Sequence, residues 1–264
     1  MTVAADLLER FALAQAIARE AGALALAHFK ARDKLNIETK ANAQDVVSIA
    51  DRETEDLIRG RVSEAFSNDG VLGEEYGLSD GTSGWTWVVD PIDGTSPFVF
   101  GMPNWCVSTA LLHDDKLVGG VVYAPVTDEL FAAANGQGAT LNGTPIRVNP
   151  DHRLTNTMTG IGSNHLADPV VVGKICENLL AQGGNFFRNG SGALMLAYVA
   201  AGRLGGYFEP FMNAWDCLGG YCIIAEAGGV HRDFEIAGGK LLTPQPVFAA
   251  APGVEKALRV LVGV

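Results

Sequence analysis

The sequence predicts a mixed α/β protein in which layered sheets and helices enclose a buried core. Two observations lead to this prediction. Apolar residues recur at helical spacing near the N-terminus, and short β-rich segments separated by turn residues follow them. The chain has 264 residues, of which 48% are hydrophobic and 19% charged, so it is long enough for a large core and too apolar for a disordered protein. The pattern changes near Pro150, which predicts one lobe over residues 1–150 and a second over 151–264.

The expected elements follow from the spacing of apolar residues and from turn signals. In chain order, we expect helices over 6–28 and 51–66, strands over 85–89, 105–112, 116–123 and 130–134, a strand over 159–162, helices over 169–180 and 191–201, a strand over 204–208, and helices over 216–227 and 254–261. The segment His113-Asp114-Asp115 is expected to join two strands as a hairpin, and Asn142-Gly143 is typical of a tight turn.

The charge and the cysteines limit the classes of partner and compartment. The chain has 19 Lys+Arg against 30 Asp+Glu, a net charge of −11, which argues against a nucleic-acid-binding surface. The uncharged stretch 94–113 contains two prolines, so we expect no membrane partner. No secretory signal is visible, and none of the four cysteines forms a CxxC pair. A cytoplasmic protein with reduced thiols is therefore expected.

The candidate chemistry begins where the strand expected over 85–89 stops at Asp90-Pro91. Pro91 restricts φ and Gly94 permits a tight reversal, so Asp90 and Asp93 can converge on one side of a turn. The same turn would leave the carbonyl of Ile92 as a free oxygen ligand. Thr95 is expected to cap a following helix, with the amides of Gly94 and Thr95 facing an anion.

Two further acidic residues join this candidate site. Glu74 follows the apolar pair Val71-Leu72 at an expected strand end, and Asp216 lies at the start of an expected helix. Each feature alone is most often a surface turn, a solvated strand end or a helix cap. If these carboxylates share one cleft, each pair at 4 Å costs about 4 kcal/mol at an effective dielectric near 20. Such a cluster must bind protons or cations, and its oxygen ligands favour Mg²⁺ or Mn²⁺.

In this order and spacing, the motifs resemble the inositol monophosphatase family over nearly the whole chain. The matching segments are Gly73-Glu74-Glu75, Asp90-Pro91-Ile92-Asp93-Gly94-Thr95 and Trp215-Asp216, together with Lys40, Asp45 and Asp51, residues 141–146, residues 188–200 and residues 226–229. Three segments depart from the usual pattern: Ser96-Pro97-Phe98, Gly205, and Cys217-Leu218-Gly219-Gly220. None of these departures removes an expected metal ligand.

The resemblance implies a fold, a reaction and a set of roles. The fold would be an αβαβα sandwich of the inositol monophosphatase and fructose-1,6-bisphosphatase type, and the reaction Mg²⁺-dependent hydrolysis of a phosphate monoester. Glu74, Asp90 and the Ile92 carbonyl would bind one Mg²⁺, and Asp90, Asp93 and Asp216 a second, with a third, weaker ion near Glu74. Thr95 and Glu74 would activate the attacking water, with Asp51 behind Thr95, and the amides of Gly94 and Thr95 would hold the phosphate. A homodimer and sensitivity to lithium are also implied.

The substrate is less well determined by the motifs. Glu209, Ser191, Gly192 and Arg188 are expected to contact a small phosphorylated polyol, which favours inositol 1-phosphate. Residues 101–105 resemble histidinol-phosphate phosphatases of the family, so a phosphorylated amino alcohol is the alternative. A 3′(2′),5′-bisphosphate nucleotidase is a third possibility. A non-catalytic member that binds metal or phosphate is the alternative of a different class.

Overall fold

The computed structural model describes residues 3–32, 37–39 and 46–264. Lys40 and Asp45, which carry part of the family resemblance, lie outside the described residues. Within the described part, none of the helices combines the length and apolarity that crossing a bilayer requires.

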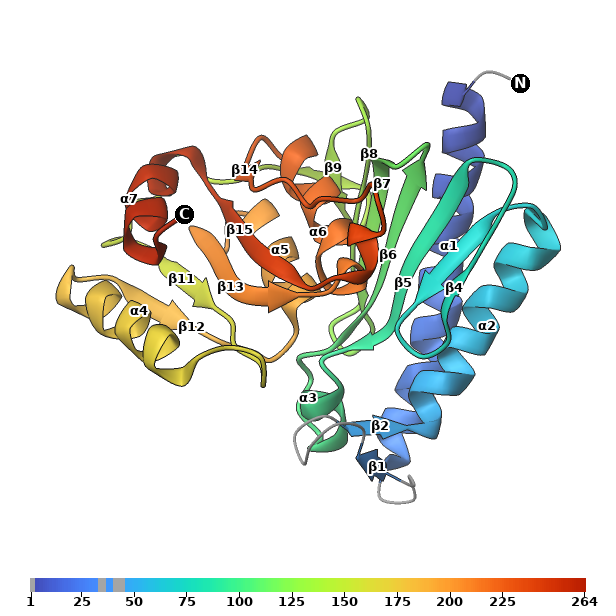
Figure 1. The fold of residues 1–264 in the computed structure, drawn as a ribbon, viewed down its shortest axis with the longest axis horizontal. Helices are drawn as coiled ribbons and strands as arrows, with labels where there is room; N and C mark the ends of the chain where they lie inside the picture. Colours follow the sequence, from blue (N-terminus) through green and yellow to red (C-terminus); the bar gives the residue numbers. More distant parts are fainter. Residues whose placement is uncertain (1–2, 33–36, 40–45) are drawn as a thin grey trace.

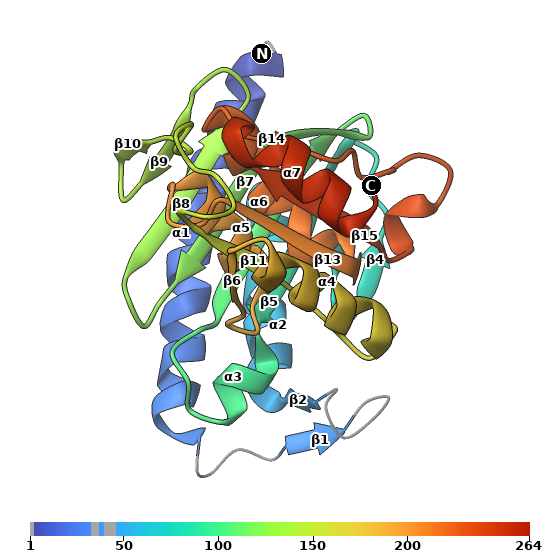
Figure 2. The ribbon, with the colours of Figure 1, turned by 90° about the vertical axis from the view of Figure 1, so that its left-hand side faces the viewer.

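The described elements form five layers, α-β-α-β-α (Figure 1). Helices α1 (Val3–Lys30) and α2 (Ile49–Ala65) cover one face of an eight-stranded sheet. Helices α5 (Gly192–Ala200) and α6 (Ala214–Glu226) lie between this sheet and a five-stranded sheet. Helices α4 (Pro169–Ala181) and α7 (Pro252–Val262) cover the outer face of the second sheet (Figure 2). The expected αβαβα sandwich is confirmed.

The larger sheet has the strand order β10-β9-β8-β7-β6-β5-β3-β4 and is antiparallel apart from the β3–β5 pair. Its strands are β3 (Gly70–Gly73), β4 (Gly77–Ser79), β5 (Trp85–Asp93), β6 (Cys106–His113), β7 (Lys116–Ala124), β8 (Glu129–Ala134), β9 (Ala139–Leu141) and β10 (Thr144–Ile146). The expected hairpin across residues 113–115 is confirmed by the β6–β7 pairing. The expected turn at Asn142-Gly143 joins β9 and β10, and both residues have positive φ, as a tight hairpin turn requires.

The smaller sheet has the order β12-β11-β13-β15-β14 and mixes parallel and antiparallel pairs. Its strands are β11 (Met158–Ile161), β12 (Asn185–Phe187), β13 (Gly206–Met212), β14 (Val230–His231) and β15 (Gln245–Ala250). The remaining elements are a two-stranded ribbon of β1 (Ile37–Thr39) and β2 (Val46–Ser48), the short helix α3 (Thr95–Val99) and a 3₁₀ turn (Lys240–Leu242). The first sheet ends at Ile146 and the second begins at Met158, and we keep the division into two lobes near residue 150 as a proposal.

Most expected elements are present with ends shifted by a few residues, and two expectations need correction. The strand expected over 85–89 does not stop at Asp90-Pro91; it continues to Asp93, because a bulge at Pro91 and Ile92 lets the pairing with β6 resume. The strand expected over 204–208 instead spans Gly206–Met212. Its register with β15 shifts between Glu209 and Met212, and this irregularity hides the simple alternation of buried residues.

The central helix layer packs very closely on the larger sheet. A Cβ on Gly120 of β7 would lie 2.2 Å from the carbonyl oxygen of Gly219 in α6, and a Cβ on Gly219 would lie 2.9 Å from the carbonyl oxygen of Thr109. Gly219, which belongs to one of the segments that depart from the usual family pattern, therefore allows backbone-to-backbone contact here. Gly205 has a similar explanation, since a Cβ there would lie 2.3 Å from the Thr157 side chain. A side chain at residue 205 would not fit without movement of Thr157.

Candidate active site

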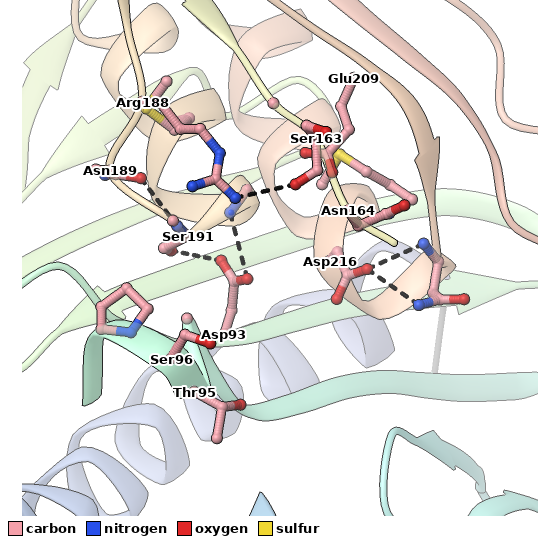
Figure 3. Close-up of a pocket in the computed structure, with 18 of the residues that line it drawn as sticks. Asp93, Thr95, Ser96, Ser163, Asn164, Arg188, Asn189, Ser191, Glu209 and Asp216 are labelled. Carbon is pink, nitrogen blue, oxygen red and sulfur yellow. Dashed lines mark hydrogen bonds between the residues drawn. The ribbon is translucent and has the colours of Figure 1, made fainter. Parts of the chain in front are cut away.

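A cavity of about 460 Å³ opens where the end of β5 meets α3 and the N-termini of α5 and α6 (Figure 3). Most of the expected site residues line it: Glu74, Asp93, Gly94, Thr95, Arg188, Ser191, Gly192, Glu209 and Asp216. Asp51, Asp90 and Ile92 are buried behind this lining. The fold thus brings residues from both sheets and from the central helices to one place.

The bulge in β5 explains how Asp90 and Asp93 come together. Residues three apart on a regular strand point to opposite faces of the sheet. Here Asp90 pairs with Ser108 and Asp93 with Cys106, so two residues of β5, Pro91 and Ile92, oppose one residue of β6. The extra residue reverses the alternation and turns both carboxylates to the same side.

Asp216 completes a cluster of three carboxylates. Asp90, Asp93 and Asp216 each offer an oxygen, and these oxygens all lie within 4.8 Å of one another. Burial, followed by the nearby charges of Glu74 and Asp93, raises the pKa of Asp90 well above its ordinary value. Burial and the charges of Asp93 and Glu74 raise the pKa of Asp216 in the same way. The cluster is therefore destabilised without a cation or bound protons, and its oxygen donors suit a hard divalent cation.

Asp93 is held by the N-terminus of α5. Its carboxylate accepts hydrogen bonds from Ser191 Oγ at 2.5 Å, from the Ala193 amide at 2.7 Å and from the Gly192 amide at 3.3 Å. Burial raises the pKa of Asp93, and these donors act in the opposite direction. Ser191 is itself the N-cap of α5 and accepts from the Leu194 amide. Donors at a helix N-terminus thus favour the ionised carboxylate.

Asp216 is oriented by the first turn of α6, as Figure 3 shows. One of its oxygens accepts from the backbone amide of Asn213 at 3.0 Å and from the Asn213 side chain at 3.2 Å. Asn213 and Asp216 form a capping box at the start of the helix. The rotamer of Asp216 is therefore determined by the same contacts that begin α6.

Thr95 does not cap α3, contrary to expectation. The N-cap position belongs to Gly94, and Thr95 is the first residue of the helix. The Thr95 hydroxyl donates to the Ile92 carbonyl at 3.2 Å and lies 3.4 Å from Asp51 Oδ1. The Ile92 carbonyl oxygen therefore accepts a hydrogen bond within the protein, in addition to any cation that it would bind. Asp51 does lie behind Thr95, where the resemblance put it.

Gly94 occupies a position that only glycine fits. Its φ is +96°, and a Cβ at this residue would lie 2.8 Å from the carbonyl oxygen of Asn104. Both conditions exclude a side chain. The departure at Pro97 is also explained, because this proline lies in the first turn of α3, where the missing amide is tolerated.

Glu74 follows the last residue of β3. Since β3 and β5 are parallel neighbours with Gly73 opposite Val89, their carboxyl ends reach the same edge of the sheet. This edge carries Glu74 and Asp90, and the charge of Glu74 contributes to the raised pKa of Asp90 and of Asp216. The fourth carboxylate thus acts electrostatically on the cluster.

Glu209 lies in the wall of the cavity contributed by the smaller sheet. Its carboxylate accepts a hydrogen bond from the Tyr207 hydroxyl, two residues earlier on the same face of β13. Burial raises the pKa of Glu209 to about 7, although Tyr207 and the positive charge of Arg188 oppose the shift. Arg188 is exposed and donates to the Ser163 carbonyl at 3.0 Å. The wall therefore presents an acid that changes charge near neutral pH.

The cavity also has an apolar rim. Phe100 and Met102 both line it, and they are 80% and 48% exposed. Large apolar side chains with this exposure at the mouth of a polar cavity offer a contact surface to a ligand.

Several neighbours of the site were not expected from the motifs. Asn213 holds Asp216, Tyr207 holds Glu209, and the Asn189 side chain accepts from the Ser191 amide at 2.9 Å. The spacing of Asn213 and Asp216 is that of a capping box and could have identified the first contact. The Tyr207–Glu209 pair could have been recognised as two residues on one face of a strand.

The comparisons with known proteins agree with this geometry. The model of the inositol monophosphatase family matches residues 6–261. Inositol-1-monophosphatase of Rhizobium meliloti is 40% identical over 81% of this chain and 82% of its own length. Nus factor SuhB of Xylella fastidiosa is 38% identical over 83% of this chain and 79% of its own.

Solved structures agree as well. The extragenic suppressor protein SuhB from Bartonella henselae superposes with a TM-score of 0.88 and 33% identity, covering 95% of this chain and 96% of its own. SaIMPase-II has been solved with inositol monophosphate bound and with 2′AMP bound. Both structures have a TM-score of 0.78 and 29% identity, covering 97% of this chain and 93% of their own.

Proposed function

This chain belongs to the inositol monophosphatase family, and we propose that it hydrolyses the phosphate monoester of a small polyol. Inositol 1-phosphate is the first candidate substrate. The observation that carries the proposal is the convergence of Asp90, Asp93 and Asp216, with an oxygen of each within 4.8 Å of the others. A phosphate monoester would bring negative charge to this acidic cleft, so cations are needed between the two.

We assign these cations to Mg²⁺, two or three per site, with Mn²⁺ as a substitute. Glu74, Asp90 and the Ile92 carbonyl would hold one ion, and Asp90, Asp93 and Asp216 a second. Bound Mg²⁺ supplies the positive charge that acidifies the attacking water and neutralises the phosphate. The oxygen-only donor set and the raised pKa of Asp90 and Asp216 support the assignment.

The residues of the chain have complementary tasks in the proposed reaction. Glu74 accepts a proton from the attacking water, while Thr95, backed by Asp51, orients it. The water oxygen then forms a bond to phosphorus as the bond from phosphorus to the ester oxygen breaks. The leaving alkoxide takes up a proton from solvent water, and Glu74 returns its proton to the solvent. The amides of Gly94 and Thr95 are assigned to the phosphate. Both residues line the cavity at the start of α3, which supports this assignment.

The alcohol portion of the substrate is assigned to the wall of the cavity that carries Glu209. Glu209 would accept hydrogen bonds from substrate hydroxyls, and Ser191, Gly192 and Arg188 would contact the same group. The burial of Glu209 and its position in the cavity wall support this role. The name of the Rhizobium relative and the inositol monophosphate bound to SaIMPase-II favour a phosphorylated inositol.

Histidinol phosphate is the second candidate substrate, and the apolar rim favours it. The exposed ring of Phe100 and the side chain of Met102 could contact a flat heterocycle that an inositol ring does not provide. The same rim would admit a nucleoside, and 2′AMP binds to SaIMPase-II.

One assay tests these assignments together. Phosphate release is measured with Mg²⁺ for inositol 1-phosphate, histidinol phosphate and adenosine 3′,5′-bisphosphate, and kcat/KM is compared. The highest value is expected for inositol 1-phosphate. A kcat/KM at least ten times higher for histidinol phosphate would make it the preferred substrate in place of inositol 1-phosphate. Some relatives are named Nus factor, which is not the name of an enzyme. An absence of hydrolysis for all three substrates would therefore favour a non-catalytic member of the family.

A further inference from the structure

Helix α2 presents two buried acids, one helical turn apart, to the candidate active site. Asp51 and Glu55 are 1% and 0% exposed, and their spacing of four residues places them on one face of the helix. The same face continues with the buried residues Ile58 and Val62, which pack in the core beneath the larger sheet. Asp51 lies against Thr95, whereas no role in the proposed reaction has been given to Glu55.

Glu55 contacts the backbone on both sides of Glu74. Its Oε2 accepts from the Glu75 amide at 2.8 Å, and its Oε1 accepts from the Tyr76 amide at 3.3 Å. Before Glu74, the carboxylate occupies the space that a side chain on residue 73 would need, because a Cβ on Gly73 would lie 2.0 Å from Glu55 Oε1. A glycine is therefore required at residue 73 for the carboxylate to approach the chain at this point.

Arg59 holds the carboxylate and the surrounding hairpin in place. Its Nε donates to Glu55 Oε1 at 2.7 Å, and its other nitrogens donate to the Gly77 carbonyl and, at 3.0 Å, to the Ser79 hydroxyl. Glu55 and Arg59 thus form an ion pair between a buried carboxylate and a partly buried guanidinium, and this pair joins α2 to the β3–β4 hairpin. Pairs of this kind need several satisfied hydrogen bonds to be tolerated in a core, and here the turn after Glu74 supplies them.

We propose that Glu55 is a positioning residue that fixes the backbone around Glu74 and so sets the position of the Glu74 carboxylate relative to Asp90 and Asp216. The proposal rests on the proposed function, in which Glu74 is a metal ligand and accepts a proton from water. One helix face then positions both residues assigned to the attacking water: Asp51 acts on Thr95, and Glu55 acts on Glu74. Groups that orient a metal ligand from behind typically change metal affinity 10–100-fold when altered.

Glu55→Gln is the informative variant, because it preserves size and removes the charge. The carboxylate accepts on both oxygens, whereas glutamine must place its NH₂ group toward one set of these donors. The turn after Glu74 or its link to Arg59 therefore loses a bond. The first probe is Mn²⁺ alone, with free Mn²⁺ measured by electron paramagnetic resonance. We expect the dissociation constant to rise about 10–100-fold.

Asp69→Asn is the matched control. Asp69 is also a buried carboxylate paired with an arginine, Arg10, and it accepts further bonds from Trp87 and Ser83. It precedes β3 and lies at the opposite end of that strand from Glu74. This control should lose thermal stability while keeping Mn²⁺ affinity within about twofold of the wild-type protein.

A double-mutant cycle shows whether Glu55 acts through Glu74. In the Glu74→Gln background, adding Glu55→Gln should change Mn²⁺ affinity by less than about twofold. Arg59→Lys is the second variant, in case Glu55→Gln fails to fold, and it should weaken Mn²⁺ binding about 3–10-fold. Wild-type Mn²⁺ affinity in folded Glu55→Gln, or in Arg59→Lys if Glu55→Gln does not fold, would overturn the proposal.

Kinetics separate this inference from the proposed function. With the best substrate of the panel, Glu55→Gln should lower kcat and raise the Mg²⁺ concentration for half-maximal rate, with KM changed by less than about threefold. If the wild-type protein hydrolyses nothing while the Mn²⁺ results hold, the proposed function fails and the positioning role stands. If the wild-type protein is active but Glu55→Gln behaves as Asp69→Asn does, the positioning role fails alone.

Discussion

Asp93 and Ser191 stand 98 positions apart in the chain, yet the Ser191 hydroxyl donates to the Asp93 carboxylate at 2.5 Å. The bond joins the end of β5 in the larger sheet to the start of α5 in the central helix layer. It also links the candidate metal cluster to the candidate substrate residues, because Asp93 belongs to the first group and Ser191 to the second.

Replacement of Asp93 by asparagine should remove most activity and preserve the fold. Asparagine keeps the shape, but it presents an NH₂ group either to the metal cluster or to the donors of α5. We expect kcat to fall at least about 100-fold, with a circular dichroism spectrum like that of the wild-type protein. Ser191→Ala is the control for the helix contact, and it should cost about 1 kcal/mol of stability through loss of the N-cap. Full activity of Asp93→Asn would contradict the two-metal assignment.

Glu209 should make the stability of the metal-free protein depend on pH in a predictable direction. Its pKa is about 7 in the folded protein against an ordinary value of 4.5. Because the folded state holds this proton more tightly, the stabilisation is complete below pH 4.5 and is lost as the pH rises toward 7. Glutamine has no such proton. The unfolding free energy of Glu209→Gln should therefore rise relative to the wild-type protein by up to roughly 3 kcal/mol between pH 4.5 and 7.5.

Urea unfolding at several pH values measures this difference. Glu129→Gln is a control of opposite sign, since the hydrogen bond from Arg203 lowers the pKa of Glu129. That contribution is present above the ordinary pKa of 4.5 and is lost as the pH falls. A parallel pH dependence of Glu209→Gln and the wild-type protein would contradict the raised pKa of Glu209.

Removal of divalent cations should lower the melting temperature. The folded state alone assembles Asp90, Asp93 and Asp216, so a cation binds it in preference to the unfolded chain. At a Mg²⁺ concentration of 100 times the dissociation constant, we expect a gain of about 2.7 kcal/mol. Differential scanning calorimetry with a chelator and with added Mg²⁺ provides the measurement. A melting temperature unchanged by Mg²⁺ would argue against a metal site in the cluster.

Asp69 should stabilise the protein at neutral pH and cease to do so in acid. Burial alone would raise its pKa, but hydrogen bonds from Arg10, Trp87 and Ser83 outweigh burial and lower the pKa below 3.8. Its contribution is thus present above pH 3.8 and is lost as the pH falls through the lowered pKa. Asp69→Asn should cost about 2 kcal/mol at pH 7, and the difference from the wild-type protein should shrink below pH 3.8 in chemical denaturation experiments.

Gly120 should not tolerate even a methyl group. The added Cβ would meet the Gly219 carbonyl at 2.2 Å and the Cys222 side chain at 2.9 Å, and α6 would have to move away from the sheet. We expect Gly120→Ala to cost about 3 kcal/mol. The matched control is Gly60→Ala on α2, where nothing lies within 4 Å of the added atom, and this variant should gain about 0.5–1 kcal/mol. Equal melting temperatures for the two variants would contradict the close packing described here.

Local patterns in the sequence were sufficient for much of the fold. Helical spacing identified α1, α2 and the later helices, and turn residues identified the hairpins at 113–115 and 142–143. Short strands such as β4, β12, β14 and β15 were not anticipated, because strands of two to six residues carry little periodicity of their own. Their stability comes from neighbours distant in sequence.

The candidate site shows the same division. By itself the sequence determined the acidic residues, their order and the family they resemble, because those depend on residue type and spacing along the chain. Only the tertiary structure decided that β5 continues through a bulge to turn Asp90 and Asp93 to one side, that α5 holds Asp93, and that Glu55 reaches the backbone around Glu74. The physical reason is that these contacts join segments that are far apart in sequence, and no local spacing encodes where a sheet and a helix meet.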